Sequence, residues 1–291
     1  MPAPRLTGEQ RRVLDWAAAA RRDLPWRRTR DPWAVLVAEV MLQQTQVDRV
    51  VPRWERFLRR WPDPAGCAAA TVADVLTEWS GLGYPRRARD LHGAAVRVRD
   101  HHGGTFPRHL DDLLDLPGVG PYTARAVLAF SFEEDVAVVD TNVGRVLARR
   151  AGRRLTPREA QLAADEWVPV GEGWAWNQGM LDLGALRCRP AVPECTGCPV
   201  RRTCLWARTG RPLPDPAAGS AGVSRRQAPF EGSARQARGR LMRALEAGPV
   251  PPSELSGVTG RDVAAAVVVA DSLVADGLAV RAADGSLTLP R

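Results

Sequence analysis

Four cysteines lie within 17 residues, as Cys188-x6-Cys195-x2-Cys198-x5-Cys204. Thiolates this close, in a proline-containing loop after a helix, favour one metal centre that holds the loop together. Disulfides are disfavoured, because the first ten residues contain no apolar export signal. Zinc and a cubane iron–sulfur cluster both accept four cysteine ligands, so general chemistry leaves both open. The remaining cysteine, Cys67, is predicted to be a small buried residue.

Apolar residues recur with a helical period through the first 200 residues, and strand patterns are almost absent there. The pattern therefore predicts a mainly α fold. The expected helices cover residues 7–22, 31–60 with an interruption near Pro52, 71–80, 86–101, 109–115, 121–131, 141–150, 157–168 and 174–186.

The composition changes at residues 208–233, where Pro, Gly, Ser and Arg dominate and the apolar period ends. This segment is predicted to be a linker, either a solvated tether or a basic strap along DNA phosphates. After it, residues 234–246 and 260–276 predict helices, with Ser253 capping a short helix between them. Residues 278–281 and 286–289 predict a hairpin around Asp284-Gly285. Three helices and a hairpin indicate a winged-helix-like module.

The net charge of +8 and the pI of about 10.3 suit a polyanionic partner such as nucleic acid. Every basic residue is arginine, which biased codon usage would explain equally well. Without lysine, covalent imine chemistry on a lysine side chain is excluded. No apolar run approaches the length of a membrane span, and without an export signal we expect a cytoplasmic protein.

A glycine-rich turn, Leu116-Pro-Gly-Val-Gly-Pro-Tyr-Thr-Ala124, precedes a predicted helix. Gly118 and Gly120 allow a tight turn that brings backbone N–H groups, including that of Val119, close to an anion. The helix start adds its positive dipole end, so the turn is suited to bind phosphate without a charged side chain. An ordinary helical corner shares this pattern.

Two carboxylates occupy unusual positions. Asp140 follows the apolar pair Val138-Val139 at a predicted helix start, where aspartate commonly caps the backbone. Glu39 lies on an otherwise apolar helix face, where a glutamate is either exposed or buried and available as an acid.

The cysteine spacing resembles the [4Fe–4S] loop of endonuclease III and MutY. The glycine turn followed by Val138-Val139-Asp140 resembles the helix-hairpin-helix DNA glycosylases. Residues 38–45 (AEVMLQQT) are similar to the catalytic segment of the MutY family, and Tyr122 stands where endonuclease III has its Schiff-base lysine. The resemblance to the MutY family covers about Asp23 to Cys204, in the short form of its actinobacterial members.

This resemblance implies a helix-hairpin-helix DNA glycosylase fold, with a six-helix barrel domain and a [4Fe–4S] helical domain. The expected parts are an N-terminal helix (1–29) packed on the cluster domain, the barrel (30–135), the cluster domain (136–207), the basic linker (208–233) and the winged-helix-like module (234–291). The implied cofactor is a [4Fe–4S] cluster on Cys188, Cys195, Cys198 and Cys204.

The resemblance also implies roles for single residues. Glu39 would protonate the adenine leaving group, and Asp140, helped by Tyr122, would stabilise the positive charge on the sugar. Contacts to the extruded base and its partner are implied for Arg22, Trp26, Arg27, Leu42, Gln43, Gln44, Thr45 and Asp182. Residues 81–84 (GLGY) resemble the loop that wedges into the duplex, which implies that Leu82 and Tyr84 enter the DNA. Contacts to DNA phosphates are implied for Gly118, Val119, Gly120 and Asn142.

Three departures from the family stand out. Asp182 replaces its glutamate, Tyr84-Pro85 replaces a frequent Tyr-Tyr, and residues 234–291 are too short for a Nudix-like domain that senses 8-oxoguanine. We therefore expect a monomeric, monofunctional adenine glycosylase acting on double-stranded DNA, on adenine opposite 8-oxoguanine or guanine. The alternatives are a thymine or uracil mismatch glycosylase of the same fold, and a non-catalytic DNA-binding regulator with a cluster.

Overall fold

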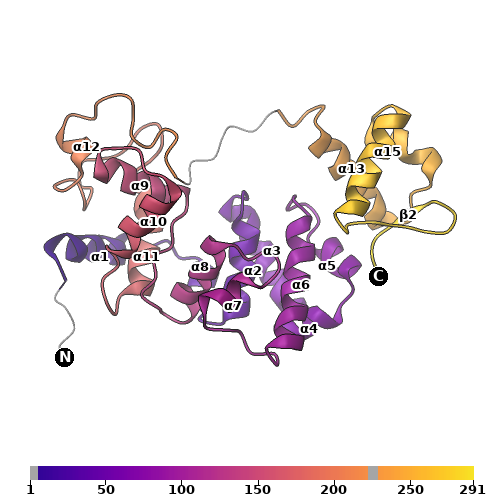
Figure 1. Cartoon of the computed structure of the whole chain (residues 1–291), viewed down its shortest axis with the longest axis horizontal. Coiled ribbons are helices and arrows are strands. Elements are labelled where there is room, and N and C mark those ends of the chain that lie inside the picture. Colours follow the sequence, from indigo (N-terminus) through magenta and orange to yellow (C-terminus); the bar gives the residue numbers. More distant parts are fainter. Residues whose placement is uncertain (1–5, 222–228) are drawn as a thin grey trace. The chain divides into compact units, whose positions relative to one another are not determined.

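The computed structural model describes residues 6–221 and 229–291, and its helices confirm the predicted mainly α fold (Figure 1). The helices before the cysteines are α1 (Gly8–Ala20), α2 (Pro32–Leu42), α3 (Val47–Arg60), α4 (Pro64–Ala69), α5 (Val72–Glu78), α6 (Arg86–His101), α7 (Leu110–Leu114), α8 (Pro121–Ser131), α9 (Thr141–Ala151), α10 (Pro157–Asp165) and α11 (Gly173–Asp182). A short 3-10 turn covers Pro25–Arg27, a π-helical turn covers Leu183–Arg187, and α12 (Leu205–Arg208) follows the last cysteine.

The predicted helix over residues 31–60 is interrupted at a different place from the one expected. Pro52 lies inside α3, where it removes one backbone hydrogen bond without ending the helix. The break falls instead between α2 and α3, where Gln44 adopts a left-handed backbone with φ of 56°. The local sequence predicted a break at the proline. The observed break instead coincides with the place where a distant residue, Arg87, binds the carbonyl groups at the end of α2.

The chain packs into two compact units. The first contains Met1–Val35, Arg108–Leu114 and Gly120–Arg225, and the second contains Leu36–Pro107, Asp115–Val119 and Arg226–Arg291. Glu39 belongs to the second unit and Asp140 to the first.

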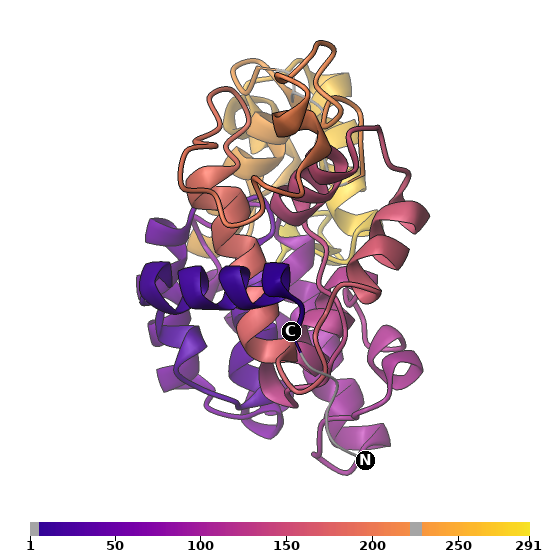
Figure 2. The same cartoon turned by 90° about the vertical axis from the view of Figure 1, so that its left-hand side faces the viewer.

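In the first unit, α1 lies across α11, as Figure 2 shows. The two helices approach closely because Gly179 has no side chain: a Cβ there would lie 2.6 Å from the Cβ of Ala17. The core beneath them is apolar and contains Val13, Val143, Val146, Leu147, Trp167, Trp176, Met180 and Leu183.

The segment predicted as a linker begins within this first unit. Ala217 and Ser220 are buried, and the N–H of Ala221 donates to the carbonyl of Leu155 at 2.9 Å. Trp206 donates through Nε1 to the carbonyl of Pro212 at 2.8 Å. Part of the Pro-rich segment therefore packs against the helices that precede it.

In the second unit, α4 and α5 both pack against α6. Phe57 of α3 makes edge-on ring contacts with Trp61 at the end of α3 and with Trp79 at the end of α5, so aromatic rings pack these two helix ends together.

The C-terminal module has the predicted three helices and hairpin: α13 (Ala234–Ala247), α14 (Leu255–Thr259), α15 (Val263–Ala275), β1 (Val280–Arg281) and β2 (Leu287–Thr288). Val280 pairs with Thr288 in the antiparallel register, and the strands are shorter than expected. Ser253 does not cap α14; it lies in a 3-10 turn (Pro252–Glu254) that leads into this helix. Across the described residues, no helix is long and apolar enough to cross a membrane.

Candidate functional site

Glu39 is a buried acid in an apolar helix. Asp31 caps the start of α2 by accepting from the N–H groups of Trp33 and Ala34 at 3.1 and 3.3 Å. Eight residues after Asp31, Glu39 is 6% exposed, and its neighbours Ala38 and Val40 are buried. The structure thus resolves the alternative left open by the sequence: the glutamate is buried rather than exposed.

Arg87, which sequence analysis missed, joins the end of α2 to the loop Gly81–Tyr84. Its guanidinium is buried and donates to backbone carbonyls of both segments and to the Thr45 hydroxyl at 3.2 Å. Burial lowers its pKa to about 10. The carbonyl acceptors are those of Val40 (2.7 Å), Met41 (2.9 Å), Gln43 (2.7 Å), Leu82 (3.2 Å) and Gly83 (3.0 Å).

The loop Gly81–Tyr84 depends on left-handed backbone conformations. Gly81 and Gly83 have φ of 84° and 74°, and Tyr84 has φ of 49°, which is uncommon for a residue with a side chain. Leu82 is buried, whereas 38% of Tyr84 is exposed. Of the two residues predicted to enter DNA from this loop, Tyr84 is the accessible one. On the α2 side, Gln44 is exposed, and Leu42, Gln43 and Thr45 are half-buried.

Asp140 is the N-cap of α9. One carboxylate oxygen accepts from the N–H groups of Asn142 and Val143 at 2.8 and 2.7 Å, and the other accepts from the Asn142 side-chain amide at 2.8 Å. Burial raises the pKa of the Asp140 carboxyl above its ordinary value, although these hydrogen bonds act in the opposite direction. The side chain is half-buried, and its three hydrogen bonds fix its orientation at the start of α9.

Asn142 continues this network toward the cysteines. Its side-chain oxygen accepts from Nη2 of Arg145 at 2.8 Å, and Nε of Arg145 donates to the carbonyl of Cys188 at 2.6 Å. Gly184 lets the π-helical turn approach α9 closely, since a Cβ at Gly184 would lie 2.5 Å from the Cβ of Asn142. The residue predicted to bind phosphate thus has its side chain engaged with Asp140 and Arg145.

The glycine turn connects α7 to α8. Gly118 has φ of 74°, and a Cβ there would lie 2.7 Å from the Cβ of Asp90, so only glycine fits. Gly120 is the N-cap of α8, and Pro121 occupies the first turn, where a missing N–H costs little. Tyr122, half-buried, stands in this same first turn.

Asp182 is fully buried among arginines. Its carboxylate accepts from both terminal nitrogens of Arg27 at 2.7 and 2.9 Å and from Nε of Arg22 at 2.6 Å. Burial acts to raise the pKa of Asp182, but the ion pairs with Arg27 and Arg22 outweigh it and lower that pKa. Arg27 and its neighbour Trp26 are themselves buried. The Asp182 carboxylate therefore pairs with Arg27 and fixes the position of its guanidinium.

The four clustered cysteines line a single cavity, together with Arg149 and Trp206. Nη1 of Arg149 donates to Sγ of Cys188 at 3.4 Å, and its Nη2 pairs with Asp215 at 2.5 Å. Within the described parts of the chain, no three histidine, cysteine or acidic side chains are arranged to hold a metal ion as they stand. The arrangement nevertheless offers four sulfur ligands around one space, with an N–H donor beside one of them.

Arg87, Arg145, Arg149 and Asp215 were all missed from the sequence. The chain's basic residues are all arginine, so an arginine alone carries little information. One signal was available: Asn142, Arg145 and Arg149 are spaced by three and four residues, which places them on one face of α9.

Comparisons with known proteins agree with this geometry. A family model described as HhH-GPD superfamily base excision DNA repair protein matches residues 37–170. The adenine DNA glycosylase of Mycobacterium tuberculosis (strain CDC 1551 / Oshkosh) is 40% identical over 308 aligned positions, covering 100% of this chain and 97% of that protein.

Two solved structures are also similar. A thermostable thymine-DNA glycosylase has a TM-score of 0.66 at 30% identity, covering 69% of this chain and 95% of that one. A trapped endonuclease III–DNA covalent intermediate has a TM-score of 0.60 at 26% identity, covering 72% of this chain and 100% of that one.

The fold and the site define a helix-hairpin-helix DNA glycosylase of base excision repair. Within that class, the chain belongs to the adenine DNA glycosylase family. The resemblance stated from the sequence is therefore confirmed, and the alternative of a non-catalytic regulator is set aside.

Proposed function

We propose that this DNA glycosylase hydrolyses the N-glycosidic bond of adenine paired with 8-oxoguanine, and more weakly of adenine paired with guanine. The observation that carries the proposal is Glu39, a carboxyl 6% exposed within an apolar helix. Glycosidic cleavage requires an acid at the leaving group, and Glu39 is a carboxyl shielded from bulk solvent that can serve as that acid. The relative in Mycobacterium tuberculosis, named an adenine DNA glycosylase, supports adenine as the base.

In the proposed reaction, Glu39 transfers its proton to a ring nitrogen of adenine while the C1′–N9 bond breaks. The bonding electrons leave with the base, and the sugar becomes an oxocarbenium-like cation. Asp140, oriented by three hydrogen bonds, stabilises that cation by its negative charge, with help from Tyr122. Water then adds to C1′, its released proton restores Glu39, and an abasic site remains.

The proposed enzyme cleaves the glycosidic bond, releases the base and leaves the DNA strand intact. Strand cleavage by a glycosylase of this fold requires an amine that forms an imine with the sugar. The chain contains no lysine, and Tyr122 occupies the first turn of α8 after the glycine turn. Tyrosine cannot form that imine, so simple hydrolysis follows.

We propose a [4Fe–4S] cluster as the resident cofactor, held by Cys188, Cys195, Cys198 and Cys204. The four sulfurs line one cavity, and the N–H donor from Arg149 suits a negatively charged thiolate. When present, the cluster would cross-link the two ends of the loop from Cys188 to Cys204. Iron and acid-labile sulfide should be present in the purified protein and absent from a Cys198→Ser variant.

The remaining predicted residues are proposed to bind DNA. Backbone N–H groups at Gly118–Gly120 and the start of α8 would bind a phosphate. Gln43, Gln44, Thr45 and Tyr84 would enter the duplex as the base is extruded, which offsets an unstacking cost of a few kcal/mol. Arg27, held by Asp182, would face the extruded base beside Trp26.

The Glu39→Gln variant tests the assignment. Gln cannot donate a proton as an acid, so single-turnover adenine release should fall by at least about 100-fold, while DNA binding is retained. Glu55→Gln, on the exposed side of α3, is the matched control and should release adenine normally. Normal release by Glu39→Gln would refute the role of Glu39.

A further inference from the structure

The C-terminal module contacts both helices that flank the Gly81–Tyr84 loop, all within the second unit. Before the loop, the Ser80 hydroxyl donates to the carboxylate of Glu246 at 2.8 Å. After it, Nε of Arg86 pairs with the carboxylate of Asp276 at 2.7 Å. The loop is therefore held at each end by an acidic side chain of the module.

Two further bonds widen this contact. Arg89, one turn into α6, donates to the backbone carbonyl of Asp276. The N–H of Ala73, in the first turn of α5, donates to the carbonyl of Pro290 at 2.9 Å. Gly277, with φ of 64°, lets the chain turn beside Arg89 after α15 ends. The module thus contacts α5 and α6 at separate points.

Asp276 is the centre of this contact. Its side chain is 15% exposed, and it also pairs with Arg238 of α13, which links α15 to α13 within the module. Partial burial acts to raise the pKa of Asp276, but the ion pairs with Arg86 and Arg238 outweigh it and lower that pKa. The carboxylate therefore remains charged near neutral pH, and its partners are charged as well.

The backbone of the Gly81–Tyr84 loop adopts a conformation at Tyr84 that depends on support from its surroundings. Three of its four residues have left-handed backbone conformations, and Tyr84 adopts one despite its side chain. Glycine adopts this conformation freely, but at a residue with a side chain, such as Tyr84, it persists only where surrounding contacts enforce it. A loop that enters DNA in a preformed shape loses less conformational freedom on binding than a loop that must first become ordered.

We propose that the C-terminal module braces the Gly81–Tyr84 loop, fixing its two flanks so that Tyr84 is held ready to enter a DNA duplex. Glu246 and Asp276 are the positioning residues, and they act through Ser80, Arg86 and Arg89. The entry of Tyr84 into DNA rests on the proposed function, whereas the brace is a property of the free protein.

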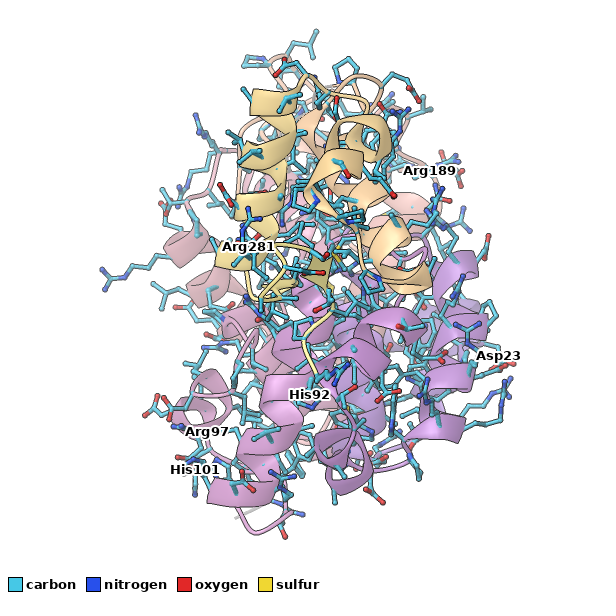
Figure 3. All side chains as sticks on the ribbon, turned by 90° about the vertical axis from the view of Figure 1, so that its right-hand side faces the viewer. Asp23, His92, Arg97, His101, Arg189 and Arg281 are labelled. Atoms are coloured by element: carbon cyan, nitrogen blue, oxygen red, sulfur yellow. The ribbon has the colours of Figure 1, made fainter. Side chains whose placement is uncertain are left out.

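Hydrogen–deuterium exchange of the free full-length protein tests the brace without DNA. In the double variant Glu246→Gln/Asp276→Asn, amides of residues 79–89 should exchange about tenfold faster than in the wild type. The matched control is Asp271→Asn, which breaks an ion pair with Arg281 (labelled in Figure 3) inside the same module. That control should leave exchange at residues 79–89 unchanged.

Two results would overturn the brace. One is unchanged exchange at residues 79–89 in the double variant. The other combines two observations: faster exchange throughout residues 234–291 in the double variant, and unchanged exchange at residues 79–89 in a Ser80→Ala variant. Ser80→Ala removes one contact of the loop with the module and leaves the module itself intact. Faster exchange at residues 79–89 in Ser80→Ala supports the brace even if the double variant loosens the module.

The consequence for DNA is measured separately, with 2-aminopurine in place of the target adenine. The double variant should extrude this base about five- to tenfold more slowly than the wild type, with Asp271→Asn unaffected. Tighter DNA binding with unchanged extrusion would contradict the proposed role of the brace in DNA entry, because Asp276 would then only keep Arg86 from binding phosphates. If the wild type released adenine from no duplex, the proposed function would fail while the exchange data still decided the brace.

Discussion

Asp140 combines a structural and a proposed catalytic task in one side chain. As the N-cap of α9 it accepts two backbone N–H bonds, and its charge is the proposed counterion of the sugar cation. Asparagine caps helices about as well as aspartate but carries no charge. The Asp140→Asn variant should therefore stay folded, with single-turnover base release reduced about 100- to 1,000-fold. A melting temperature near the wild type with release within tenfold of it would contradict the counterion role.

The raised pKa of Asp140 also predicts a pH dependence. Burial disfavours the charged form, so the carboxyl takes up a proton at a higher pH than an ordinary aspartate, whose pKa is about 3.9. Because the proposed active form is the carboxylate, base release should decline as the pH falls through this raised pKa. A single-turnover pH profile measures the decline. A rate that stayed constant down to the ordinary aspartate range would rule out this view of Asp140.

Asp182 is predicted to matter for stability as well as for the base. Its replacement by asparagine leaves Arg27 buried without a counter-charge, which should lower the free energy of unfolding by about 3 kcal/mol. Asp23→Asn is the control, since Asp23 forms an exposed ion pair with Arg28 and should have no measurable effect. Urea denaturation compares the two. Equal stability of both variants would show that the buried pair contributes nothing.

At the scale of elements, Arg87 determines where α2 ends and how the neighbouring loop lies. Replacing it with methionine removes its hydrogen bonds to carbonyls of both segments, so the free energy of unfolding should fall by about 3 kcal/mol. Arg97→Met, at an exposed ion pair with Asp115, is the matched control (Arg97 is labelled in Figure 3). Urea denaturation that gave both variants the same stability would contradict this role.

Most elements could be predicted because their signals are local. The glycine turn, the Asp140 cap and the cysteine spacing are each contiguous in sequence, and each lies where expected. The break between α2 and α3 was misplaced because its cause is not local: Arg87 binds the end of α2 from more than forty residues away. Likewise, no sequence pattern indicated that Asp215, in a Pro-rich segment, would pair with Arg149.

At the scale of the whole molecule, the net charge of +8 fits a DNA partner but could not identify one. The family followed from several motifs together, and the match to the Mycobacterium tuberculosis relative extends over 100% of this chain, C-terminal module included. The solved thymine-DNA glycosylase covers only 69% of the chain, at 30% identity. The fold alone does not separate adenine from thymine as the released base, which leaves the segment around Glu39 as the distinguishing feature.

The central claim is tested most directly by single-turnover base release from four duplexes. These carry adenine opposite 8-oxoguanine, adenine opposite guanine, thymine opposite guanine and uracil opposite guanine. The proposed function predicts fast release from the first, slower release from the second and none from the other two. Release of thymine or uracil, with adenine left in place, would preserve the fold and the role of Asp140 but refute an adenine site built around Glu39.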